Sequence, residues 1–295
     1  MTIPKETLRQ VRRLQIRTSR HVDAILTGSW HSAFKGRGME FEEVRPYQMG
    51  DDVRAIDWNV TARSDQPYVK LFREERQLAV QLLVDTSSSM RVGSSVQTKR
   101  AFAAELAGLL AFSAIDNGDQ VGLTLFSDRI VKHVPLGGSS RHAVRIIRDI
   151  LVGEEAMRDR VETTNLVVAL EHLTKTTHQA TVAFLISDFV DVALSEELTR
   201  AMRVAASRHE IIPIQVRDAH DQTLPNTGLT YMRDAETGHV VLVDTSSRRL
   251  RRQFDRWQEQ SRQLWQTWYG KLKLRPLTLT LGEDPVGPLR NYFDR

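Results

Sequence analysis

The sequence contains no cysteine among its 295 residues. Disulfide bonds, thiolate metal sites and cysteine nucleophiles are therefore excluded, although this absence says little about the cellular compartment. The nine histidines do not occur at a metal-ligand spacing such as His-Glu-x-x-His. The chain also lacks Gly-x-x-x-x-Gly-Lys-Ser/Thr, so it does not hydrolyse ATP through a P-loop of its own.

Long apolar runs are missing as well. No stretch approaches the roughly 18 apolar residues that span a bilayer, and the first residues do not form the apolar core of a signal peptide. Hydrophobic residues make up 41% and charged residues 26% of the chain, as in soluble globular proteins. The net charge of +4 is small for this length, so nucleic-acid binding is not indicated. We expect a soluble cytoplasmic protein.

Basic residues nevertheless gather in two places. The arginines concerned are Arg9, Arg12, Arg13, Arg17 and Arg20 near the start, and Arg248, Arg249, Arg251, Arg252 and Arg256 further along. Such runs are most simply solvated faces of helices. The alternative is docking onto an acidic partner or peripheral contact with anionic lipid headgroups.

A polar loop follows an apolar run that begins at Leu78. The run to Val84 is typical of a strand buried on both faces of a parallel sheet. Asp85 ends it, and Ser87 and Ser89 follow at every second position. Ligands of open α/β sheets bind outside the carboxyl ends of the strands, so these oxygens suit a hard cation such as Mg2+. Alternatively, the serines are ordinary turn and helix-capping residues.

Apolar strand-like runs alternate with helical patterns from residue 78 onward, which predicts an α/β fold with a parallel sheet flanked by helices. Strands are expected at residues 78–84, 120–126, 129–134, 180–188, 210–216 and 277–281, the third of them at an edge. Helices are expected at residues 97–117, 140–151, 164–178, 196–207, 247–269 and 288–294. Residues 229–232 and 239–243 flank Asp234-Ala-Glu-Thr-Gly238 and predict a hairpin.

The spacing Asp-x-Ser-x-Ser resembles the metal-ion-dependent adhesion site of von Willebrand factor A domains. This resemblance implies a threonine on a later loop and an aspartate at the end of another apolar strand. Thr164 fits the first position better than Thr163 because it directly precedes Asn165, and Asp188 fits the second. The fold implied is a von Willebrand A-like, doubly wound and mostly parallel sheet flanked by helices.

The same resemblance implies how a metal is held. The ion is Mg2+, with Mn2+ and Ca2+ as alternatives. Ser87, Ser89 and Thr164 are implied to touch it, while Asp85 and Asp188 hold its waters. Mainly neutral hydroxyls leave the charge of the ion undercompensated and one coordination position open, which an acidic side chain of a partner protein would fill.

The segment before the metal loop narrows the family. It reads GRGMEFEEVRPYQMGDDVRAIDW over residues 36–58 and continues through Tyr68-Val-Lys70 to Glu75. This combination resembles the domain of unknown function 58 family, in which such a segment precedes a von Willebrand A-like domain. Members typically occur with MoxR-type AAA+ ATPases, so the resemblance implies an adaptor or substrate-recognition factor for such an ATPase.

Acidic side chains and arginines alternate along this segment. The simplest interpretation is a salt-bridge network that locks a mostly extended unit onto the main domain, with Tyr47 and Trp58 as packing anchors. A second metal or catalytic site is the alternative. We therefore divide the chain into a basic amphipathic N-terminal helix at residues 1–28, this small extended or β unit at residues 29–77, and the von Willebrand A-like domain at residues 78–295 with its hairpin insertion.

The leading functional hypothesis is a non-enzymatic, metal-dependent protein-binding module. A Mg2+-dependent hydrolase is the competing class, since the same ion could activate water. No general base is evident beside the metal residues, and the Gly-x-Ser-x-Gly elbow that would make Ser87 a nucleophile is missing. A structural scaffold with an unused metal site is the third hypothesis.

Overall fold

The computed structural model describes residues 40–64, 66–73, 77–93, 97–156, 161–190, 192–218, 221, 223–233 and 239–294. The expected N-terminal helix at residues 1–28 lies outside these residues. Among the helices that are described, none is both long enough and apolar enough to cross a membrane.

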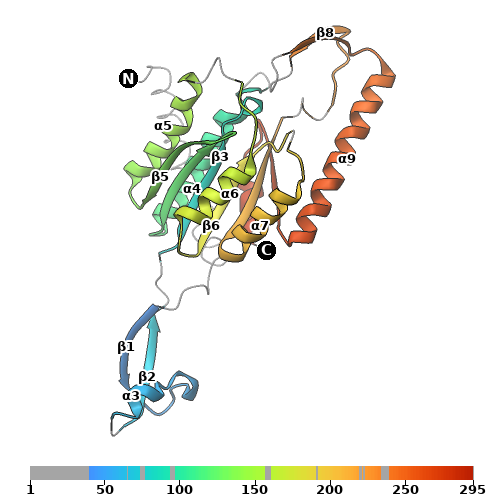
Figure 1. The fold of residues 1–295 in the computed structure, drawn as a ribbon. Coiled ribbons are helices and arrows are strands. Elements are labelled where there is room, and N and C mark those ends of the chain that lie inside the picture. Colours follow the sequence, from blue (N-terminus) through green and yellow to red (C-terminus); the bar gives the residue numbers. More distant parts are fainter. Residues whose placement is uncertain are drawn as a thin grey trace.

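A six-stranded sheet forms the centre of the molecule (Figure 1). Its strands lie in the order β10 (Leu277–Thr280), β7 (Glu210–Arg217), β6 (Thr181–Ser187), β3 (Ala79–Asp85), β4 (Gln120–Phe126) and β5 (Ile130–Gly137). Neighbouring strands are parallel except β4 and β5, which are antiparallel. The expected doubly wound, mostly parallel sheet is confirmed, and β5 lies at its edge as predicted.

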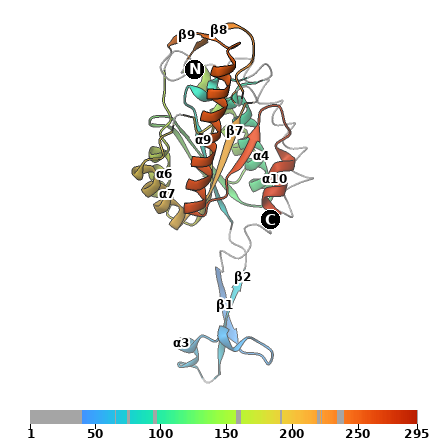
Figure 2. The ribbon, with the colours of Figure 1, turned by 90° about the vertical axis from the view of Figure 1, so that its right-hand side faces the viewer.

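Helices cover both faces of this sheet (Figures 1 and 2). One face carries α4 (Lys99–Asp116), α5 (Ser140–Ala156) and α10 (Val286–Phe293), and the other carries α6 (Leu166–Thr176), α7 (Glu196–Arg208) and α9 (Arg248–Leu272). Side chains of β3 point alternately to the two faces of the sheet, which explains the two helix layers. Leu82 and Val84 pack with α4, while Leu83 packs with α6.

The direction of winding across the sheet changes between β3 and β6. β3 comes first of the six strands in the chain. The chain adds β4 and β5 on one side of β3, and then β6, β7 and β10 on the other, so the winding reverses between β3 and β6. Ligands of open α/β sheets bind outside the carboxyl ends of the strands at such a switch point. Both strands are buried along their whole length, and their carboxyl ends lead directly into Asp85 and Asp188.

A small separate unit precedes the sheet. β1 (Glu40–Pro46) pairs in antiparallel fashion with β2 (Tyr68–Arg73), and the short α3 (Trp58–Thr61) lies between them in sequence. Arg45 and Asp51 form an ion pair of 2.7 Å within this unit, as expected for part of a salt-bridge network.

Two expectations for this unit were wrong. Trp58 is 67% exposed, so it is not a packing anchor. Figures 1 and 2 show the described part of the unit standing apart from the six-stranded sheet rather than locked onto it. Asp57 caps the start of α3, and Trp58 is the first residue of that helix. This local arrangement is the same whether or not the main domain covers Trp58, so the sequence did not decide whether the Trp58 side chain is buried.

The expected hairpin is also present. β8 (Leu229–Arg233) pairs with β9 (Val240–Asp244) in an antiparallel two-stranded sheet. It follows β7 in sequence and immediately precedes α9. In both ribbon views it projects beyond the end of the large sheet, next to the start of α9 (Figures 1 and 2).

Asp149 fastens α5 to the edge strand β5. Its carboxylate lies 2.7 Å from Lys132 Nζ and 2.9 Å from Arg148 Nη2, and its own side chain is 4% exposed. Burial alone would raise the pKa of Asp149, but the hydrogen bonds and positive charges of Lys132 and Arg148 outweigh burial and lower it. The ionised carboxylate therefore stabilises the folded protein.

We predict that Asp149→Asn lowers the free energy of unfolding by about 1–3 kcal/mol at neutral pH. Because the folded-state pKa is lowered, this stabilisation is present above the unfolded-state pKa of about 4 and is lost as the pH falls through the folded-state pKa. Urea denaturation of both proteins should show a difference that shrinks below about pH 4. Glu171→Gln, which removes the exposed pair with Lys175, is the matched control and should change stability by less than about 0.5 kcal/mol. A difference for Asp149→Asn that persists undiminished in acid would contradict the prediction.

Candidate metal centre

Asp85 joins three segments of the chain at the switch point. It is fully buried, and its Oδ1 accepts a hydrogen bond of 2.8 Å from the backbone N–H of Ser87. Its Oδ2 accepts one of 2.6 Å from the hydroxyl of Ser187 and one of 3.1 Å from the hydroxyl of Thr164. The loop after β3, the loop before α6 and the end of β6 therefore meet at one carboxylate.

The two serines extend this contact to Asp188. Ser87 Oγ and Ser89 Oγ lie 3.1 Å apart in a hydrogen bond, and Ser89 Oγ donates to Asp188 Oδ1 over 3.2 Å. Ser87, Ser89 and Asp188 are all buried. All five residues predicted from the sequence thus form one connected cluster, which we call the Asp85 cluster: Asp85, Ser87, Ser89, Thr164 and Asp188. That they bind a metal stays a prediction.

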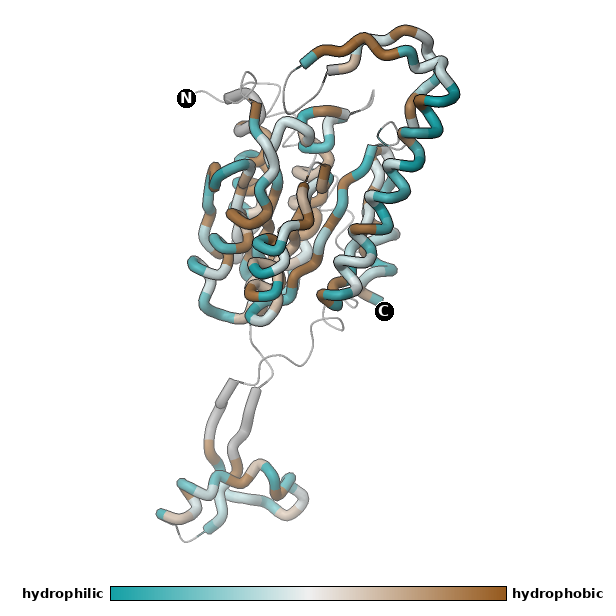
Figure 3. Tube along the Cα trace, turned by 45° about the vertical axis from the view of Figure 1, so that its right-hand side comes forward, coloured by the Kyte–Doolittle hydropathy of each residue, from teal (hydrophilic) through white to brown (hydrophobic). Residues whose placement is uncertain are grey.

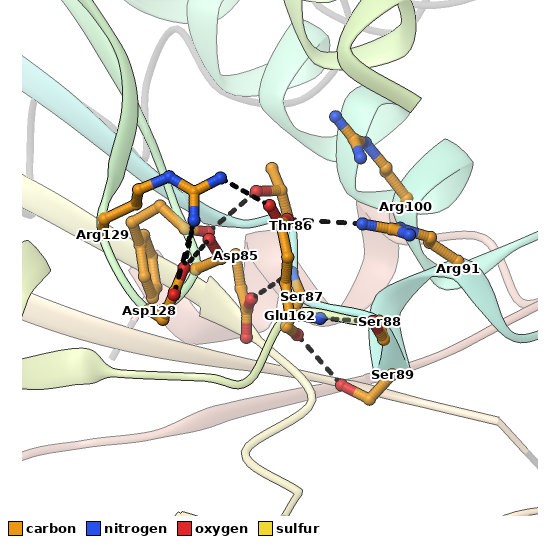
Figure 4. Close-up of polar contacts among 12 residues, drawn as sticks. Asp85, Thr86, Ser87, Ser88, Ser89, Arg91, Arg100, Asp128, Arg129 and Glu162 are labelled. Atoms are coloured by element: carbon orange, nitrogen blue, oxygen red, sulfur yellow. Dashed lines mark hydrogen bonds and ion pairs between the residues drawn. The ribbon is translucent and has the colours of Figure 1, made fainter. Parts of the chain in front are cut away.

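Backbone contacts hold the serine loop in position (Figure 4). The backbone N–H and the hydroxyl of Thr86 both donate to the carbonyl of Phe126 on the neighbouring strand, over 2.7 and 2.9 Å. Ser88 exchanges two hydrogen bonds of 2.9 Å with Glu162, its N–H donating to the Glu162 carbonyl and its hydroxyl accepting from the Glu162 N–H. The even-numbered side chains of the loop therefore anchor it, and the odd-numbered ones build the cluster.

Glu162 carries charge as well as backbone contacts. Its carboxylate pairs with Arg129 at 2.9 Å and with Arg91 at 3.3 Å, so it connects the loop after β4 to the end of the serine loop (Figure 4). Just beyond it, the side chain of Asn165 caps α6 by accepting hydrogen bonds from two backbone N–H groups. Thr164 directly precedes this cap, so its position beside Asp85 is fixed from both sides.

The environment of Asp85 disfavours its ionised form. Burial and, second, the nearby carboxylate of Asp188 raise the pKa of Asp85 to about 6, although the hydrogen bonds from Ser187 and Ser87 oppose the shift. These partners are hydroxyl and amide groups, which do not neutralise a carboxylate. A cation bound among the oxygens of the cluster would favour the ionised form.

Asp188, in contrast, has a fixed cation beside it. Lys99, the first residue of α4, places its Nζ 3.0 Å from Asp188 Oδ2 and 2.5 Å from Asp221 Oδ2. The Lys99 side chain is 3% exposed. Burial alone would lower the pKa of Lys99, but the carboxylates of Asp188 and Asp221 outweigh burial and raise it. The ammonium group therefore stays charged at neutral pH.

Aromatic packing fixes the backbone next to Asp188. Phe189 has a φ of 55°, which is unfavourable for a residue that is not glycine. Its ring packs edge-on against Trp265 and Tyr269 of α9, with centroid distances of 5.2 and 6.4 Å. The hydroxyl of Ser187 also accepts from the Phe189 N–H over 3.0 Å. The strained conformation is thus held by α9 on one side and by the cluster on the other.

Sequence reasoning missed three residues that the structure places around the cluster: Ser187, Lys99 and Asp221. Ser187 had a visible signal, because it precedes Asp188 at the end of an apolar strand. Lys99 had a weaker one, as a charged residue at the start of a helix that is otherwise apolar on almost all sides. Nothing local marks Asp221, whose role depends on the distant Lys99.

The donor set fits a hard divalent cation. The Asp85 cluster contains only hydroxyl and carboxylate oxygens, the ligand type that Mg2+ prefers. Within the described part of the chain, no three His, Asp or Glu side chains gather as a metal cluster, so hydroxyls must supply much of the coordination. The raised pKa of Asp85 is a second indication, since a buried carboxylate without a positive neighbour gains from a bound cation.

Comparison with known proteins gives the family. An uncharacterized protein of Mycobacterium tuberculosis is 32% identical over 230 residues, which cover 78% of this chain and 71% of its own length. An uncharacterized protein of Mycobacterium bovis matches to the same extent. The model of the family described as "Protein of unknown function DUF58" matches residues 43–264.

Solved structures are similar in fold only. The conserved hypothetical protein BatB from Bacteroides thetaiotaomicron is 16% identical, with a TM-score of 0.49 over 72% of this chain and 96% of that one. A von Willebrand factor type A structure from Catenulispora acidiphila is 13% identical, with a TM-score of 0.36 over 51% of this chain and 35% of that one. The expected α/β fold, a doubly wound and mostly parallel sheet flanked by helices, is confirmed by the order and direction of the six strands given above. From the extent of the family match and the identity to the mycobacterial proteins, the chain belongs to the DUF58 family of proteins of unknown function.

Proposed function

We propose that this protein is a non-catalytic interaction module that binds Mg2+ at the Asp85 cluster and, through the ion, an acidic side chain of a partner protein. Mn2+ and Ca2+ are alternative ions. The observation that carries the proposal is the convergence of three hydroxyls and two carboxylates from separate loops at the switch point of the sheet. Interaction modules of this kind need a rigid site, and every one of these side chains is held by hydrogen bonds.

The charge balance of the cluster supports an acidic partner. Ser87, Ser89 and Thr164 would touch the ion as neutral groups, and Asp85 and Asp188 would hold its waters. Lys99 already offsets one of the two carboxylate charges by its ion pair with Asp188. An ion in this site would therefore keep a net positive charge, which a carboxylate from outside would neutralise.

A hydrolytic role is less well supported. The charged side chain closest to the cluster, other than its own carboxylates, is Lys99, and its raised pKa keeps it protonated, so it does not accept a proton at neutral pH. The hydroxyl of Ser87 is hydrogen-bonded to that of Ser89, and the neighbouring carboxylate of Asp85 already accepts hydrogen bonds from Thr164 and Ser187.

The partner class follows from the family resemblance rather than from any residue. By the resemblance given above, members of this family typically occur with MoxR-type AAA+ ATPases, so we propose that the acidic residue belongs to such an ATPase or to its client protein. The role would then be that of an adaptor or substrate-recognition factor.

The two adjacent threonines allow a matched test of metal binding. Thr164 donates its hydroxyl to Asp85, whereas Thr163 is exposed. Thr164→Val should weaken Mg2+ binding about tenfold or more, because a group holding the ion is lost while the shape is kept. Thr163→Val should bind as the wild type does. Isothermal titration with MgCl2 measures both affinities, and equal affinities for the two variants would remove Thr164 from the site.

Removal of Lys99 should have the opposite effect on metal affinity. Lys99→Met leaves the buried carboxylate of Asp188 without its cation and also removes the partner of the partly exposed Asp221, so the protein should be destabilised by about 3–5 kcal/mol without metal. Mg2+ should bind more tightly, since the fixed positive charge of Lys99 repels the ion, and each pair of unit charges about 4 Å apart repels by ~4 kcal/mol at an effective dielectric constant of about 20. Thermal melts in EDTA and in MgCl2 should therefore show a larger Mg2+-induced rise in Tm than for the wild type. Lys175→Met, at an exposed ion pair, is the control. An unchanged Mg2+ response of Lys99→Met would show that Lys99 does not face the ion.

Partner binding should depend on both the ion and the carboxylate at its centre. We expect a purified MoxR-type AAA+ ATPase to be retained by the immobilised protein in Mg2+, and to be lost in EDTA or with Asp85→Asn. Retention that is unaffected by EDTA would contradict an ion-mediated contact. Phosphatase and esterase assays run in parallel test the hydrolase alternative, and Mg2+-dependent turnover abolished by Ser87→Ala would overturn the non-catalytic proposal.

A further inference from the structure

Apolar side chains cover the β8–β9 hairpin without being buried. Tyr231 and Leu229 are 75% and 72% exposed, and Val240 and Leu242 are 53% and 51% exposed. The strand register pairs Tyr231 with Leu242, and the alternation of side chains puts all four on the same face of the two-stranded sheet. Figure 3 shows the hairpin as a hydrophobic stretch at the end of the molecule. We call this surface the hairpin face.

The backbone of the hairpin is also open to pairing. In the part of the chain that the structure describes, β8 and β9 form a sheet only with each other. Each strand therefore has an outer edge whose N–H and C=O groups can accept a further strand. Proteins rarely leave apolar edges of this kind exposed unless a partner covers them.

The base of the hairpin is built rigidly. Thr245 is buried, and its hydroxyl donates to the carbonyl of Gly228 over 2.7 Å and lies 3.1 Å from the hydroxyl of Thr227. Arg251 of α9 donates to the carbonyl of Thr245 over 2.6 Å. Gly228 has a φ of 81°, a conformation that suits glycine. These contacts hold the hairpin in a fixed direction relative to the start of α9.

Arginines follow the hairpin directly in sequence. Arg248, Arg249, Arg252 and Arg256 in the first turns of α9 are exposed. The first turn contains no acidic residue. Positive charge there is unfavourable for the helix itself, because the amino end of a helix already carries partial positive charge. The helix dipole of α9 therefore does not account for these arginines, and their exposed positive charge is available to an anionic partner.

We propose that the hairpin face and the α9 arginines form a docking surface for an extended segment of a partner protein, which pairs with the hairpin as an additional strand. Apolar side chains at alternate positions of that segment would cover Tyr231 and Leu242, and acidic side chains at its flank would meet Arg248 and Arg252. Strand addition of this type takes its affinity from backbone hydrogen bonds and its specificity from alternate side chains. The surface is distinct from the Asp85 cluster and does not require a metal.

Two other occupants fit less well. A second copy of the chain would bring its own arginines against those of the first, and like charges in contact oppose association. A lipid surface would have to cover Asp244, which the strand register places opposite Leu229 on the hairpin face. An acidic protein segment avoids both conflicts.

A displayed library of random peptides is the probe for this surface. The wild-type protein should select peptides that alternate apolar residues and carry acidic residues at one end. Fluorescence polarisation with a selected peptide should show about tenfold or greater loss of affinity for Tyr231→Ser/Leu242→Ser. The variant Arg248→Glu/Arg252→Glu should bind the same peptide more weakly, and it should no longer prefer peptides with acidic residues. All substituted side chains are exposed, so the fold should be kept, and circular dichroism checks this.

Matched controls lie elsewhere on the surface. Leu264→Ser removes an exposed apolar side chain of α9, and Arg200→Glu/Arg203→Glu reverses exposed charges on α7. Both should bind the peptide as the wild type does, and EDTA should have no effect, which separates this surface from the metal-dependent one.

Peptides without the apolar and acidic pattern, or affinity unchanged by the hairpin variant, would overturn the proposal. Hairpin-dependent dimerisation in analytical ultracentrifugation would assign the surface to a second copy, and hairpin-dependent sedimentation with phosphatidylglycerol vesicles would assign it to a membrane.

Discussion

The carboxylate of Asp85 is the contact on which the arrangement of the site depends. It is buried at the end of a central strand and accepts hydrogen bonds from its own loop through Ser87 and from two segments distant in sequence through Thr164 and Ser187. A charge in such a place is costly unless its oxygens are satisfied, and here each oxygen has at least one donor. The price of this burial is a raised pKa, which is the property that makes a bound cation favourable. The same carboxylate therefore organises the loops, and a bound cation would favour its ionised form.

Lys99 gives the two carboxylates of the site different electrostatic environments. Asp188 is paired with an ammonium group and Asp85 is not, although both belong to the same cluster. A site with two free carboxylates would neutralise a divalent ion by itself. With one carboxylate already paired, the ion would retain charge for a partner. The Lys99 contact also reaches Asp221, whose backbone carbonyl accepts a hydrogen bond of 2.6 Å from Gln258 of α9.

α9 connects the two surfaces that we propose. Its aromatic side chains hold Phe189 beside the Asp85 cluster, and its first turns carry the arginines beside the hairpin. The hairpin follows β7 through the loop that contains Asp221, so both surfaces lie toward the carboxyl ends of the strands (Figures 1 and 2). One end of the molecule would thus carry both of the proposed contacts, the metal-dependent one and the apolar one. A partner that used both would be recognised by two unrelated kinds of chemistry.

The sequence by itself determined the sheet and its helices, because each of these leaves a local pattern. The five clustered residues were assembled through the resemblance to von Willebrand factor A domains, which alone singled out Thr164. Buried strands read as apolar runs, helices as periodic ones, and Asp85 and Asp188 stand where apolar runs end. Only the tertiary structure decided that Ser187 bonds to Asp85, that Lys99 pairs with Asp188, and that Trp58 stays exposed. These contacts depend on which distant segments of the chain meet in the fold. The residues next to a side chain in sequence do not determine that.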